Sequence, residues 1–112
     1  MTEKSELDLR RERAAQNESA FRELNERTNN LDDRGTFNMF VCECENHGCV
    51  EPVPLTTQEY EAIRADSNSF FVIPGHEALM VDEVIERAER YLVVRKRGAG
   101  AEIAKELDPR TR

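Results

Sequence analysis

Cys42-Glu-Cys44-Glu-Asn-His-Gly-Cys49 is a stretch that places three cysteines within eight residues. Further along the chain, a Pro-Gly-His sequence adds His76 at a turn. Zinc binds four cysteine or histidine ligands in a tetrahedron, and structural zinc sites are normally closed by such side chains. The sequence therefore predicts a structural zinc site whose ligands are Cys42, Cys44, Cys49 and His76.

The loop between the cysteines has features that suit metal binding. Residues two apart on a strand point to the same face, so Cys42 and Cys44 can reach one ion. Gly48 relieves the backbone where the loop folds back. The fourth ligand is either His47 or His76. We prefer His76, because with His47 one tight loop would have to supply all four ligands.

Other interpretations of the cysteines stay open, because the spacing is less diagnostic than paired Cys-x-x-Cys knuckles. They could be ordinary buried or free thiols, ligands of an iron–sulfur cluster, or a redox-active pair. A redox sensor requires an exposed cysteine with a low pKa. The neighbouring Glu43, Glu45 and Glu51 are expected to raise the pKa of the thiols instead.

Composition limits the size of the core. The chain has 112 residues, of which 38% are apolar and 35% are charged. Globular domains are typically about 100–150 residues long, with about 45–50% apolar residues. We therefore expect one small domain with a modest core, to whose folding a structural zinc ion can contribute about 10 kcal/mol.

The same composition bears on location and enzymatic activity. No apolar leader precedes the three cysteines, which cannot all pair with one another, so we expect a cytoplasmic protein. No run approaches the roughly 20 apolar residues that cross a bilayer. Catalysis is not predicted, because zinc held by three thiolates is poorly acidic and no oxyanion hole is evident.

Residues 1–35 predict a charged N-terminal helix with Ser5 as its cap and Gly35 as its stop. Its apolar seam strengthens toward the C-terminal half, where Phe21, Leu24 and Leu31 require cover from the domain, a second copy or another protein. One heptad position of this seam holds Leu7, Ala14, Phe21 and Thr28. The other holds Arg10, Asn17, Leu24 and Leu31.

Residues 36–108 predict a small zinc-binding α+β domain. Alternation over 37–41 indicates a strand, and the stretch 52–54, with two prolines, indicates an edge or connecting segment. Thr56 and Glu59 form a capping-box pattern, which predicts a helix over 57–65. A second strand is expected over 69–73, and it ends at the turn pair Pro74-Gly75.

The segment 81–97 supports two interpretations. Val81, Val84, Ile85 and Ala88 have helical spacing, whereas 91–94 is rich in β-forming residues. We favour a hairpin with strands over 82–86 and 91–96, and the alternative is a helix over 81–90. A short helix is expected over 101–107, and residues 109–112 should fray.

Motifs along nearly the whole chain resemble those of a group of small uncharacterised actinobacterial proteins. The matching stretches include residues 11–18 (Arg-Glu-Arg-Ala-Ala-Gln-Asn-Glu), 21–27, 40–44 (Phe-Val-Cys-Glu-Cys), Glu59-Tyr60 and 74–77 (Pro-Gly-His-Glu). The resemblance implies that the three cysteines and His76 are the site residues. This chain has Glu45 where those proteins usually have glycine.

We therefore expect an α+β fold: a long N-terminal helix, then a small antiparallel sheet with short helices, braced by zinc. The expected function is a non-enzymatic, regulatory zinc-binding module that contacts a protein partner through Phe21, Leu24 and Leu31. A second hypothesis is a nucleic-acid or transcription-complex factor whose basic residues 95–97 face phosphate, although the formal charge of −7 opposes it. A thiol redox sensor is the third.

Overall fold

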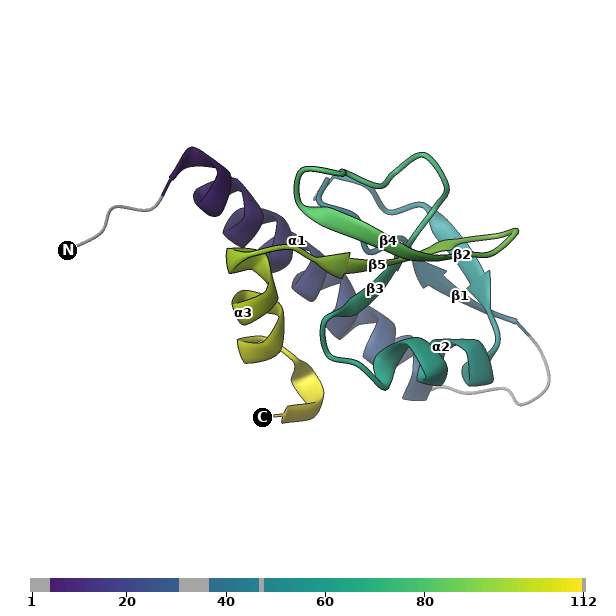
Figure 1. Cartoon of the computed structure of the whole chain (residues 1–112). Coiled ribbons are helices and arrows are strands. Elements are labelled where there is room, and N and C mark those ends of the chain that lie inside the picture. Colours follow the sequence, from purple (N-terminus) through teal and green to yellow (C-terminus); the bar gives the residue numbers. More distant parts are fainter. Residues whose placement is uncertain (1–4, 31–36, 47, 112) are drawn as a thin grey trace.

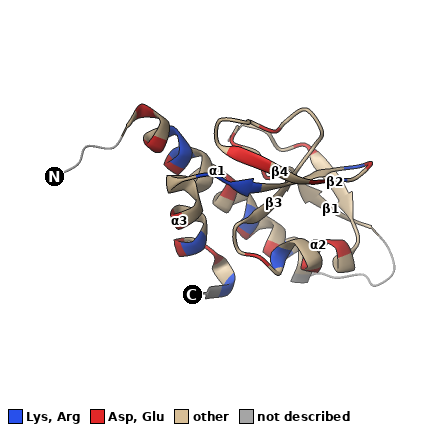
Figure 2. Ribbon diagram, in the orientation of Figure 1, with Lys and Arg blue, Asp and Glu red and all other residues tan. Residues whose placement is uncertain are grey.

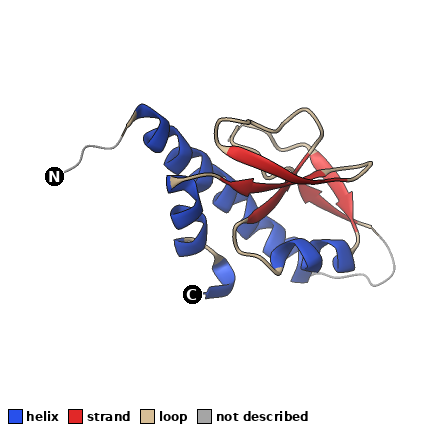
Figure 3. Ribbon diagram, in the orientation of Figure 1, coloured by secondary structure: helices blue, strands red, loops and turns tan. Residues whose placement is uncertain are grey.

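The computed structural model describes residues 5–30, 37–46 and 48–111. Its α+β architecture confirms the predicted fold class (Figures 1 and 3). The elements, in chain order, are α1 (Glu6–Asn30), β1 (Asn38–Val41), β2 (Pro52–Leu55), α2 (Thr57–Arg64), β3 (Ser69–Val72), β4 (Asp82–Arg87), β5 (Leu92–Lys96), α3 (Ala99–Glu106) and the 3-10 helix η1 (Pro109–Thr111).

The strands form two small antiparallel sheets. One pairs β1 with β2, and the other has the order β3-β5-β4. They meet where the chain leaves β1, because the Glu43 amide donates to the carbonyl of Phe71 in β3 at 2.9 Å. The cysteine-rich loop therefore begins at the junction of the two sheets.

The β4–β5 hairpin confirms the predicted strands, and the alternative helix over 81–90 is wrong. Strand β4 pairs with β5 from Asp82 to Arg87, with an irregularity in register between Val84 and Glu86. A helix would bury one side with a period of 3.6, but Ile85 is 41% exposed. Pairing with the buried strand β5 outweighs the local helical spacing.

Helix α2 begins as predicted. Thr56 and Glu59 each bond the other's backbone amide, which completes the capping box. Its Tyr60 stacks on Phe40 of β1 with 4.4 Å between ring centroids, and Phe71 of β3 meets both rings edge-on. This aromatic cluster joins the two sheets beneath α2 and forms the centre of the core.

Helix α1 begins at its predicted cap, where Ser5 Oγ accepts from the Asp8 amide at 3.0 Å. It packs against α3 and β1 (Figure 1). The close approach to α3 requires a glycine, because a Cβ at Gly100 would lie 2.9 Å from the Arg11 carbonyl oxygen. The predicted stop at Gly35 lies outside the described residues.

The buried face of α1 differs from the predicted apolar seam. Phe21 is buried but Leu24 is 44% exposed, and Leu31 lies outside the described residues. Polar side chains occupy much of the buried face. Its members are Ala14, Ala15, Glu18, Ser19, Phe21, Arg22 and Asn25.

The end of the chain also differs from expectation. Residues 109–111 form a 3-10 turn where fraying was predicted. The reason is Arg110, whose guanidinium pairs with Glu26 of α1 at 2.6 Å and with Glu61 of α2 at 2.8 Å. These ion pairs fasten the tail to two helices.

Acidic and basic residues are interspersed along all three α-helices (Figure 2). This mixture agrees with the high charged fraction of the sequence. Within the described residues, no helix has both the length and the apolar character that a membrane span needs.

Candidate metal centre

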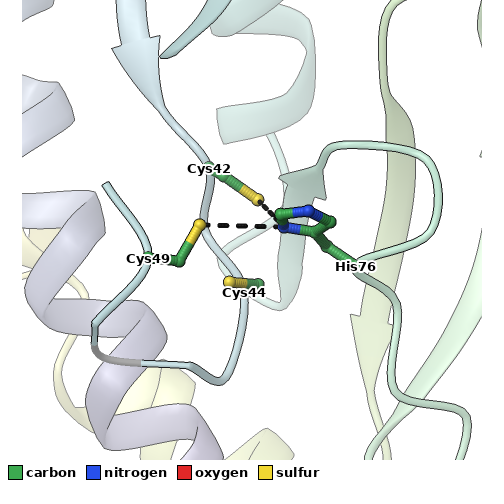
Figure 4. Close-up of side chains that lie close together, drawn as sticks. All are labelled: Cys42, Cys44, Cys49 and His76. Carbon is green, nitrogen blue, oxygen red and sulfur yellow. Dashed lines mark hydrogen bonds between the residues drawn. The ribbon is translucent and has the colours of Figure 1, made fainter. Parts of the chain in front are cut away.

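The structure brings together the four residues that the sequence singled out. Cys42 and Cys44 follow directly after β1, Cys49 precedes β2, and His76 lies in the turn after β3 (Figure 4). One potential ligand atom from each residue lies within 4.8 Å of all the others. All three cysteines are free and buried, and His76 is partly buried.

The distances suit a tetrahedral zinc ion. His76 Nδ1 lies 3.6 Å from Cys42 Sγ and 3.7 Å from Cys49 Sγ. Zinc–sulfur bonds of about 2.3 Å and zinc–nitrogen bonds of about 2.0–2.1 Å at a tetrahedral angle separate sulfur from nitrogen by about 3.6 Å. The sulfurs of Cys42 and Cys49 therefore lie at ligand spacing from the ring nitrogen, and Nδ1 is the nitrogen that faces them.

The turn after β3 orients the histidine. Gly75 has φ of +99°, a conformation that other residues rarely adopt, and the His76 amide donates to the Ile73 carbonyl at 2.8 Å. On the other side of the ring, Nε2 lies 3.5 Å from a carboxylate oxygen of Glu51. Metal-binding histidines commonly face such a group, which holds the tautomer that leaves the other nitrogen free to bind.

The thiol groups are hydrogen-bonded to one another, and these bonds shift their pKa values. A hydrogen bond from Cys42 lowers the pKa of Cys44, whereas donating that bond, together with burial, raises the pKa of Cys42. Burial also raises the pKa of Cys49. The Ile73 amide donates to Cys42 Sγ at 3.3 Å. A divalent cation would displace the remaining protons, because metals bind cysteine as thiolate.

The expectation that nearby glutamates raise the thiol pKa values is wrong for Cys44. Glu43 in particular is not an exposed neighbour of the sulfurs. Its carboxylate is fully buried and forms an ion pair with Arg22 of α1 at 2.9 Å. The hydrogen bond between Cys42 and Cys44 sets the direction of the pKa shifts of these two thiols, whereas burial sets that of Cys49.

His47 lies outside the described residues. His76 is with the cysteines, as preferred. Four ligands complete a tetrahedron and leave no position for water, which is the arrangement of structural sites. The residues present therefore fit a structural metal better than a catalytic one.

Several residues that support the site were not recognised from the sequence. Glu43, Arg22 and Asn25 form a buried network behind the cysteines, and Glu51 faces the histidine ring. The sequence does place Glu18, Arg22 and Asn25 at helical spacing on one side of α1. However, polar residues at that spacing ordinarily indicate a solvent-facing side, so the pattern did not identify a buried network.

Comparison with protein-family models, with curated proteins and with solved structures gives no match for this chain. The assignment of the site therefore depends on its chemistry and geometry. The arrangement of three thiols and one imidazole is a candidate metal centre.

Proposed function

We propose that this protein is a non-enzymatic zinc-binding module in which Zn2+ braces the fold, and that it acts in regulation by contacting another protein. The observation that carries the metal assignment is the convergence of four ligand atoms from two separate chain segments. An ion there would cross-link the loop after β1 to the turn after β3. A small hydrophobic core supplies little folding stability by itself, so such a cross-link adds most to the stability of a small domain.

The test is elemental analysis of untagged protein purified without chelator. We expect close to one zinc per chain, and Cys44→Ser should lose the metal and much of the thermal stability. The control is Ser69→Ala, which alters a small buried side chain outside the ligand set and should keep the zinc. Metal-free protein with unchanged stability would overturn the proposal.

The surroundings of the site support a structural role. A hollow of about 260 Å³ beside Cys44 and His76 is bordered by Glu45 and Glu77. Glu45 is paired with Arg10 at 3.1 Å, and Glu77 accepts from the Gly75 amide at 2.7 Å. Both carboxylates thus have structural partners, which argues against their use as general acid or base.

The proposed protein contact uses the exposed side of α1. Phe21 is buried within the chain, so it does not belong to the contact surface. Leu9 and Leu24, each 44% exposed, are the apolar side chains that α1 offers to a partner. Exposed leucines on a helix can pack into a groove of a partner or against another helix.

The test of this contact is affinity capture with the zinc-loaded chain as bait. The matched control is the variant Leu9→Asp with Leu24→Asp, which should retain zinc and melting temperature because both positions are exposed. Proteins captured by the unaltered chain and lost with the variant would support the contact. Identical capture by both chains would contradict it.

The basic residues offer little support for nucleic-acid binding. Lys96 is buried between Glu18 and Asp82, and Arg95 pairs with Asp66 at 3.2 Å. Arg97 donates to the Asp82 carbonyl at 3.0 Å. These partners neutralise or occupy the cluster that would have faced phosphate.

The proposal also carries an expectation for the compartment. Thiolate ligands require reduced cysteines, and the three cysteines are free in this fold. Reducing conditions of the kind found in the cytoplasm keep such thiols available for metal. We therefore propose a cytoplasmic location.

A further inference from the structure

Glu43 stands between two of the ligands in the sequence, yet its side chain turns away from the sulfurs into the protein. It is fully buried. Arg22 donates to its carboxylate through Nε at 3.2 Å and through Nη2 at 2.9 Å. Asn25 Nδ2 donates at 3.0 Å and the Phe71 amide at 3.3 Å. A carboxylate with this many donors is held firmly in one position.

The network fixes the backbone on both sides of the first ligand. Cys42 lies between Val41, whose backbone bonds Asn25, and Glu43. The Arg22 guanidinium also donates to the Ser69 carbonyl at the start of β3, and it lies 3.9 Å over the ring of Phe70. Two residues of α1 thus connect the cysteine segment to the strand that leads to His76.

We infer that Glu43 is a positioning residue of the metal centre and that Arg22 and Asn25 hold it in place, so that docking of α1 and metal binding strengthen each other. The inference rests on the proposed function. Groups that orient metal ligands typically change metal affinity by about 10–100-fold when they are altered. Reciprocity follows from linkage: if docked α1 raises metal affinity, bound metal must favour docked α1 by the same factor.

The chain provides a matched control for a simple loss of stability. Arg64 is as buried as Arg22 and is likewise paired with a carboxylate, that of Asp108 at 2.5 Å. Its partners, Asp108 and Glu26, belong to neither the cysteine loop nor the turn of His76. Arg22→Lys and Arg64→Lys therefore make the same chemical change at two buried ion pairs, only one of which contacts Glu43.

The experiment is a cobalt titration of the full chain, followed through the thiolate-to-cobalt charge-transfer and ligand-field bands, in competition with a chelator. We expect Arg22→Lys to weaken cobalt binding by about tenfold or more and to alter the ligand-field bands. Arg64→Lys should change the affinity by less than about twofold and leave the spectrum as it is. Equal affinities and spectra in the two variants would overturn the inference.

A second pair of variants keeps the test decisive if the arginine variants do not fold. Asn25→Ala removes a donor to Glu43, whereas Asn29→Ala on the same helix removes a bond to Glu61 of α2 at 2.9 Å. Weaker cobalt binding only in Asn25→Ala supports the inference, and equal binding in both variants overturns it. If the unaltered chain binds no cobalt, the proposed function itself fails, which distinguishes the two outcomes.

Discussion

Asn25 pairs with Val41 as a second strand would. The Asn25 side chain donates through Nδ2 to the Val41 carbonyl at 2.9 Å. Its side-chain oxygen Oδ1 accepts from the Val41 backbone amide at 2.8 Å. One helix residue thus satisfies both outward-facing backbone groups of a strand residue next to the first cysteine. Because buried backbone groups need such partners, α1 completes the environment of the cysteine segment.

Removing residues 1–33 therefore tests whether the helix is separable from residues 36–108. The deletion would leave Glu43 without Arg22 and Asn25, and Lys96 without Glu18. We expect the shortened chain to bind zinc more weakly and to lose its cooperative thermal transition, because uncompensated buried charges are strongly destabilising. Circular dichroism melting and metal content provide the measurement. An intact, zinc-loaded body would show that the helix is an independent docking element.

The choice of fourth ligand predicts opposite results for the two histidines. His76→Ala should lose stoichiometric zinc, because its Nδ1 lies within ligand distance of two sulfurs. His47→Ala should retain both the zinc and the melting temperature. Metal content of the purified variants decides between them. If zinc is lost only from His47→Ala, the ligand assignment must be reversed.

Lys96 and Arg95 are neighbours in β5, but their substitution by alanine should change the unfolding free energy by very different amounts. Lys96→Ala leaves the carboxylates of Glu18 and Asp82 buried without their cation, which predicts a loss of about 3–5 kcal/mol in unfolding free energy. Arg95→Ala breaks a pair whose side chains are both 46% exposed, so we expect less than about 1 kcal/mol. Urea denaturation at pH 7 measures both. Comparable losses would mean that the buried cluster contributes no special stability.

The anchor of the C-terminal tail should depend on pH. Burial raises the pKa of Glu26, but hydrogen bonds from Arg110 and Tyr60 and the charge of Arg64 outweigh it and lower the pKa to about 2. Since the folded-state pKa is below the ordinary value of 4.5, this stabilisation is present above about pH 4.5 and is lost as the pH falls toward 2.

Arg110→Ala should accordingly lower the unfolding free energy by about 1 kcal/mol at pH 7, and the difference from the unaltered chain should shrink in acid. Urea denaturation at each pH where the folded baseline persists gives the comparison. In a Glu26→Gln background the pH dependence of that difference should decrease, because one of the two titrating partners of Arg110 is gone. A difference that grows in acid would contradict the assignment.

Local signals in the sequence were sufficient for most elements. The Thr56–Glu59 capping box, the Pro74-Gly75 turn and the β-branched run of β5 depend on residues close in sequence, and each appears as predicted. The residues of the candidate metal centre were singled out for a similar reason, because few other roles require three cysteines so close together.

The buried face of α1 could not be predicted in the same way. Glu18, Arg22 and Asn25 are buried only because Lys96 and Glu43, far along the chain, supply charges and donors that match them. Without that tertiary pairing, the same residues are typical of a solvated helix face. The tail differs for the same reason, since Arg110 finds its carboxylates on two other helices.

The two prolines of β2 bear on how a partner can bind. The Cys42 amide bonds the Glu51 carbonyl, and this register places Pro52 and Pro54 where their nitrogens point away from β1 and carry no hydrogen to donate. Arg90 already donates to the Pro54 carbonyl. On the opposite margin of the sheet, the side chain of Asn25 already accepts from the Val41 amide. Recognition by strand addition is therefore disfavoured along β2 and at the Val41 end of β1, and so is the edge-to-edge stacking that leads to aggregation.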